Sequence, residues 1–123
     1  APPRVRDIGK SLGVGEANIR RIMKLAVQMG RVTEVSQDEY LTRSALGEII
    51  DKIGDLSRTM PDGEFAAADF RDRLGVGRNV AIRILEFFDR QGLTARHGNV
   101  RRVDQRRLAL LRSEFGEADD AAA

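Results

Sequence analysis

Cysteine is absent from this chain of 123 residues, so neither a disulfide nor a zinc knuckle can hold it together. His97 is the single histidine and the carboxylates do not gather at ligand spacing, so we expect no metal site. The sequence also lacks a signal-peptide pattern and any apolar run long enough to span a membrane. These absences predict a cytoplasmic protein that depends on a hydrophobic core.

Residues arranged for catalysis are also lacking. His97 has no Ser or Asp placed near it by a motif, so we expect it to be an exposed polar residue. The Gly-Val-Gly segments at 13–15 and 75–77 have neither a following Lys-Ser/Thr nor a third glycine at dinucleotide spacing. They indicate turns rather than phosphate loops, and we expect no enzyme activity in this chain.

The sequence does contain two helical segments joined by a tight turn. The first ends at Gly75-Val76-Gly77, and an amphipathic run from Arg78 to Gln91 follows and stops at Gly92. Gly98-Asn99 then separates two short strands, and we expect both residues to take the positive φ angles of a tight hairpin. A helix-turn-helix followed by such a hairpin is typical of a winged helix.

The run over 78–91 predicts a helix with one buried and one exposed face. Its expected inner residues are Val80, Ala81, Ile84, Leu85 and Phe88. Its expected outer residues are Asn79, Arg83, Glu86 and Arg90. One face can pack while the other meets a ligand.

The chain repeats itself after 62 positions without a gap. Leu12-Gly13-Val14-Gly15 superimposes on Leu74-Gly75-Val76-Gly77, and the window holds eight identities in all. The repeat predicts helices over 6–12 and 16–29, with Gly30 ending the second, and a hairpin through 36–39. Because no room remains ahead of Pro2, we expect the first helix of this copy to be cut off or to lie in a neighbouring domain of a longer protein.

A further helix is predicted between the two copies, with Ser44 as its cap. Pro61-Asp62-Gly63 then turns the chain into a short strand at Glu64-Phe65. The helix has apolar residues at the i, i+3, i+4, i+7 spacing, namely Leu46, Ile49, Ile50, Ile53 and Leu56.

A last helix follows Asp104, its expected cap, and has Leu108, Leu111 and Phe115 in phase with the helix 62 positions earlier. It can pack on the second domain or on the face left bare by the absent first helix. We therefore expect a mainly α protein with small β wings. Its parts are two tandem winged-helix domains, over 1–43 and 44–116, and a disordered tail over 117–123.

Charge separates the two copies. Residues 65–107 hold ten Lys or Arg against five acids, residues 1–43 hold eight against five, and the segment 44–64 between the copies holds two against five. Arg78 in the second copy replaces Glu16 in the first, and Arg96 replaces Glu34. Because phosphate attracts the arginines and repels the acids, the second copy is the expected nucleic-acid binder.

A stretch of the second copy resembles a known family. The stretch runs from Asp69 to Arg78 and is continued by Ala81-Ile82, Ile84-Leu85-Glu86, Phe88-Asp89-Arg90 and Thr94 to Asn99. It is similar to the C-terminal region of the bacterial selenocysteine-specific elongation factor, SelB. The resemblance extends back over Val5-Arg6-Asp7 and covers most of the chain.

This resemblance implies that the second winged-helix domain binds the selenocysteine insertion (SECIS) hairpin of messenger RNA. It implies no cofactor in this chain. GTP with Mg, selenocysteinyl-tRNA and the ribosome would engage the parent factor, through domains absent here. The implied RNA-binding residues are Arg71, Gly77, Arg78, Asn79, Arg96, His97 and Arg101, with Arg20 as a supporting contact from the first domain.

Two other functions stay open. One is a DNA-binding tandem winged-helix transcriptional regulator, and the other is a protein-interaction module. Glu86, in the middle of the outer helix face, offers little to a DNA groove, which favours an RNA hairpin with accessible bases. We expect a monomer that makes no membrane contact.

Overall fold

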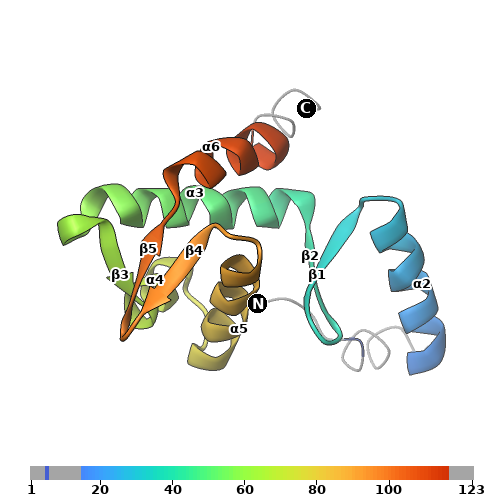
Figure 1. The fold of residues 1–123 in the computed structure, drawn as a ribbon. Helices are drawn as coiled ribbons and strands as arrows, with labels where there is room; N and C mark the ends of the chain where they lie inside the picture. Colours follow the sequence, from blue (N-terminus) through green and yellow to red (C-terminus); the bar gives the residue numbers. More distant parts are fainter. Residues whose placement is uncertain (1–4, 6–14, 117–123) are drawn as a thin grey trace. The chain divides into compact units, whose positions relative to one another are not determined.

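The chain divides into two compact units, Ala1–Arg43 and Ser44–Ala123 (Figure 1). The computed structural model describes Val5 and residues 15–116, and this part is mainly helical with small antiparallel sheets. The predicted helix over 6–12 and the predicted disordered tail lie outside the described residues. No helix in the described part is both long and apolar enough to cross a membrane.

The first unit contains one described helix and one hairpin. Helix α2 spans Glu16–Gln28, and strands β1 (Val32–Ser36) and β2 (Glu39–Thr42) pair antiparallel. Gly30 has a φ of 73°, which a residue without a Cβ takes at no steric cost, and it ends the helix as predicted. Buried Val5, Ile19 and Tyr40 pack together and form the core of this unit.

Apart from its first residue, helix α3 (Arg43–Thr59) belongs to the second unit, and its five predicted apolar residues are all buried. A 3₁₀ turn, η1 (Pro61–Gly63), leads into strand β3 (Glu64–Ala66). Both features are as predicted. Helix α3 begins one residue ahead of Ser44, however, so the prediction of Ser44 as its cap was wrong. Strand β2 already ends at Thr42, and no loop residue is left over for a cap.

Helices α4 (Ala67–Leu74) and α5 (Arg78–Arg90) form the predicted helix-turn-helix. The Asp69 carboxylate accepts a hydrogen bond of 2.9 Å from the Ala66 N–H and so holds the start of α4. At the other end Gly75 takes a φ of 74° and stops this helix. Helix α5 buries the predicted inner face, except that Val80 is half-buried and Phe87, which was not predicted, is buried.

The wing consists of strands β4 (Thr94–His97) and β5 (Val100–Val103). It joins β3 in an antiparallel sheet of order β3-β5-β4. Only Gly98 of the two turn residues has a positive φ, 63°, so the prediction of a positive φ at Asn99 was wrong. A glycine in the first central position alone is the pattern of a type II′ hairpin, which needs no special angle at the second.

The 62-residue repeat is visible in the helix boundaries. Helix α2 begins at Glu16 and α5 at Arg78, and each has 13 residues. Gly92, like Gly30, has a positive φ after the end of its helix. The similarity of the two copies therefore extends to where their second helices begin and end.

The C-terminal helix packs on α3, which selects one of the two predicted alternatives (Figure 1). Helix α6 (Gln105–Leu111) is capped by Asp104, whose carboxylate accepts from the Arg107 N–H at 2.9 Å, and it leads into a π-helical turn, η2 (Arg112–Gly116). A Cβ on Gly54 of α3 would lie 3.3 Å from Leu108 Cδ2, so glycine permits this close approach.

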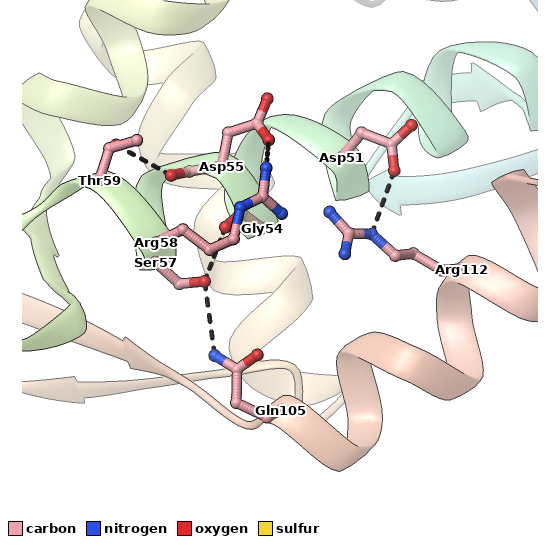
Figure 2. A network of polar contacts seen from close by, with 8 residues as sticks. All are labelled: Asp51, Gly54, Asp55, Ser57, Arg58, Thr59, Gln105 and Arg112. Carbon is pink, nitrogen blue, oxygen red and sulfur yellow. Dashed lines mark hydrogen bonds and ion pairs between the residues drawn. The ribbon is translucent and has the colours of Figure 1, made fainter.

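Polar contacts join the same two elements along their length (Figure 2). The Gln105 amide donates to Ser57 Oγ at 3.4 Å, and Arg112 Nε donates to Asp51 Oδ1 at 3.2 Å. The Ser57 hydroxyl in turn donates to the Gly54 carbonyl at 2.7 Å. These contacts set the register of α6 and η2 on α3.

Candidate nucleic-acid interface

A cavity of about 400 Å³ opens in the second unit where α4, α5 and the wing meet. Four of the predicted binding residues contribute to its wall, and all four are arginines: Arg71, Arg78, Arg96 and Arg101. The other lining residues are Ala66, Ala67, Ala68, Ile82, Glu86 and Asn99. The volume lies within the ~300–1,000 Å³ typical of small-ligand sites.

The strand register explains why Arg96 and Arg101 reach this cavity and His97 does not line it. Arg96 and Arg101 are directly opposite each other on β4 and β5, so their side chains share one face of the sheet. His97 follows Arg96 in the chain and therefore lies on the other face. Arg102 shares that face with Glu64, to which it forms an ion pair of 2.6 Å.

Arg78 stands at the first residue of α5, beside the helix N-terminus. Its side chain is exposed, and it forms no hydrogen bond or ion pair with any described residue. The N-cap residue is Gly77, which has no side chain to bond the N–H groups of the first turn. An anion at this position would meet both the arginine and the exposed N–H groups, Asn79's among them.

Arg101 differs from the other three arginines, because it is 5% exposed and paired inside the protein. Its Nε and Nη2 donate to the Asp89 carboxylate at 3.1 and 2.9 Å. The Thr94 hydroxyl donates to the same carboxylate at 2.5 Å. The guanidinium of Arg101 thus lines the cavity wall while it is engaged by Asp89, and a direct contact of Arg101 with RNA stays a prediction.

Asp89 was not among the predicted site residues, although the sequence carries a signal for it. It lies in the last turn of α5, where the partial negative charge of the helix end disfavours a carboxylate. An acid in that place indicates a cationic partner elsewhere. The hairpin register is needed to identify the partner as Arg101.

Glu86 is the one carboxylate in the wall of the cavity. It is exposed, and it makes no hydrogen bond or ion pair with another residue of the described part. Its oxygens can accept hydrogen bonds from base N–H groups, whereas they repel phosphate. The wall therefore offers cations for a backbone and one acceptor for a base edge.

Arg20, the predicted supporting contact, lies in the first unit on α2. Its guanidinium donates to the Asp38 carboxylate at 2.7 Å and to Glu16 at 3.5 Å. The hydrogen bond to Asp38 raises the pKa of this guanidinium above its ordinary value. Two carboxylates thus compensate the charge, although the side chain remains 46% exposed.

Metal ligands do not gather in the described part, where no group of three His, Asp or Glu side chains is placed to hold an ion. The elements of the second unit follow the order helix, strand, helix-turn-helix and two-stranded wing. This is the order of a winged helix, the class of domain to which the second unit belongs.

Comparison with known proteins identifies the family within this class. A model described as "Elongation factor SelB, winged helix" matches residues 60–103. The chain is 45% identical over 95 residues to the selenocysteine-specific elongation factor of Escherichia coli K12, and 30% identical over 98 residues to that of Haemophilus influenzae. Each match covers 77% of this chain and 15% of the relative.

Among solved structures, the mRNA-binding domain of elongation factor SelB from E. coli, in complex with SECIS RNA, is similar to this chain with a TM-score of 0.77. The two share 43% sequence identity, and the match covers 83% of each chain. The chain belongs to the SelB family.

Proposed function

We propose that this chain is the RNA-binding module of a selenocysteine-specific elongation factor and that its second unit binds the SECIS hairpin of messenger RNA. The arginine-lined cavity between α4, α5 and the wing is the observation that carries the proposal. It is supported by the relative of known structure, whose complex contains SECIS RNA. The residues we assign to direct contact are Arg71, Gly77, Arg78, Asn79, Arg96 and His97, with Arg20 in support and Arg101 in the cavity wall.

The arrangement suits a hairpin loop better than a duplex groove. A loop can present single bases to a concave site while its phosphates lie against the rim. Arg78 and the α5 N-terminus provide that rim, and Glu86 provides an acceptor inside it. A DNA duplex laid along α5 would instead bring its phosphates towards the Glu86 carboxylate.

The finer organisation of the module forms part of the proposal. Its two compact units correspond to two tandem winged-helix domains, of which the first contributes α2 and the β1-β2 hairpin. The repeat of helix boundaries at Glu16 and Arg78 supports this assignment. GTP and Mg binding, selenocysteinyl-tRNA and the ribosome belong to the other parts of the whole factor, in the cytoplasm.

A titration of a labelled SECIS hairpin at several salt concentrations tests the proposal. About four to six phosphate contacts give a log-log slope of roughly −3 to −5, since each contact releases somewhat under one counterion. Saturable binding to the hairpin with weaker binding to a duplex DNA of equal length is expected. Preference for the duplex would indicate a DNA-binding regulator, and no binding to either would indicate a protein-interaction module.

A further inference from the structure

Two neighbouring arginines of the wing pair with carboxylates on opposite faces of the sheet. Arg101 is buried on the cavity side, with a side chain that is 7% exposed, and Asp89 is its partner. Arg102 is the next residue along β5 and lies on the other face, where its side chain is 61% exposed and Glu64 is its partner. Of the four residues of these pairs, only Arg101 lines the arginine-lined cavity.

Asp89 binds three donors that come from both strands of the wing. Two belong to Arg101 on β5 and one to the Thr94 hydroxyl on β4, and all lie within 3.1 Å of the carboxylate. Thr94 is itself buried. The carboxylate therefore connects the end of α5 to the wing and holds the Arg101 side chain in a single place.

The same contacts withhold a positive charge from RNA. Arg71, Arg78 and Arg96 line the cavity without being buried, and Arg71 pairs with the exposed Asp72 at 3.2 Å. Arg101 is both buried and compensated by Asp89 before any ligand arrives. Without Asp89, a buried guanidinium would have no counter-charge, which is costly. Its long stem would allow it to turn into the open cavity, where phosphate is the available anion.

We propose that Asp89 is a specificity-determining residue, which keeps Arg101 in the cavity wall and away from RNA phosphates. The inference rests on the proposed function, since it concerns the same RNA site. Specificity is a difference of affinities, and every extra cation raises the affinity for all RNAs alike. By removing one cation from the phosphate-binding set, Asp89 lowers the affinity for unrelated RNA while the wall keeps the shape that the hairpin needs.

The test is Asp89→Asn in the full chain, titrated with the SECIS hairpin and with an unstructured oligouridine. Asparagine keeps an acceptor for Thr94 and removes the charge. The salt slope for oligouridine should become steeper by about 0.7, and its loss of affinity over a fourfold rise in salt should grow by about threefold. The preference for the hairpin over oligouridine should fall. An unchanged slope would overturn the proposal and leave Asp89 with a purely structural role.

Glu64→Gln is the matched control, because it makes the same change of net charge in the other pair of the sheet. Arg102 is already exposed and faces away from the cavity, so this variant should have a smaller effect on the slope. Equal effects of the two variants would mean that net charge alone acts, and the proposal would fail.

Arg101→Gln keeps the proposal testable if Asp89→Asn does not fold, as judged by its thermal melt. An arginine that is held away from RNA contributes no counterion release, so this variant should keep the native slope. A slope that is shallower by about 0.7 would show that Arg101 contacts phosphate and would overturn the proposal. A native chain that does not prefer the hairpin to oligouridine would instead refute the proposed function. The salt slopes for oligouridine would still test the role of Asp89 separately.

Discussion

Arg78 shows how one side chain can distinguish two similar units. It occupies the first position of α5, which corresponds to Glu16 of α2, and both side chains are exposed. Arg78→Glu should weaken hairpin binding by about 2 kcal/mol or more, because a charge-assisted contact is replaced by repulsion. The free energy of unfolding, measured by thermal melts, should change by less than ~1 kcal/mol, since the position is on the surface.

The reciprocal change, Glu16→Arg, is the control for this prediction. It should leave specific hairpin affinity almost untouched while it raises binding to unrelated RNA. A single labelled hairpin titrated with both variants makes the comparison. Equal losses from the two variants would indicate a surface shared by both units, contrary to the assignment of the second unit as the reader.

Tyr40 gives a second prediction at the scale of one residue. Burial, with a further contribution from its hydrogen bond to Glu34, raises its pKa from 10.0 to about 12. The neutral phenol is therefore favoured in the folded state, and the unfolded chain loses its proton first as the pH rises. The stability is complete below pH 10 and should fall between pH 10 and 12 by about 1.4 kcal/mol per unit.

Tyr40 is the only tyrosine and the chain has no tryptophan, so the ultraviolet absorbance of tyrosinate reports this group alone. The native chain should titrate with a midpoint near 12, and the chain unfolded in urea with one near 10. Tyr40→Phe should remove this part of the pH dependence of stability. A native midpoint at 10 would contradict the burial of the phenol.

At the scale of elements, the packing of α6 on α3 can be tested by two leucines of one helix. Leu108 is buried against Gly54, whereas Leu110 is 62% exposed. Leu108→Ala should destabilise the chain by about 2–4 kcal/mol, because it leaves a cavity in a packed contact. Leu110→Ala should change the free energy of unfolding by about 0.5 kcal/mol or less. Chemical denaturation of both variants checks this, and equal small effects would mean that α6 is not held on α3.

At the scale of the whole molecule, the two units are joined by a direct connection from β2 to α3. Strand β2 ends at Thr42 and helix α3 begins at Arg43, so the chain passes from one unit to the next without a linker. We expect limited hinge motion, which would let the first unit transmit hairpin capture towards the rest of the factor. NMR relaxation should give similar correlation times for α2 and α5. Independent tumbling would remove the mechanical basis of that role.

The sequence by itself determined the features that depend on local chemistry. The glycines at 30, 75 and 92 mark helix ends because each takes a positive φ that other residues avoid, and all three were readable in advance. The periodicity of α3 and α5 identified most of the buried residues of these two helices, and the 62-residue repeat identified corresponding helix starts. The resemblance to SelB rested mainly on segments between Asp69 and Asn99 and is confirmed by the comparisons.

Tertiary structure decided what depends on contacts between distant residues. Arg101 looks like Arg96 in the sequence, and only the pairing of β4 with β5 places it beside Asp89 and buries it. His97 and Arg96 are neighbours in the chain, yet the pleat of the strand sends them to opposite faces. The sequence likewise left two surfaces on which α6 could pack, and the contact between Gly54 and Leu108 shows that it packs on α3. A residue type states which charge is available, but burial and a partner decide whether a ligand can reach it.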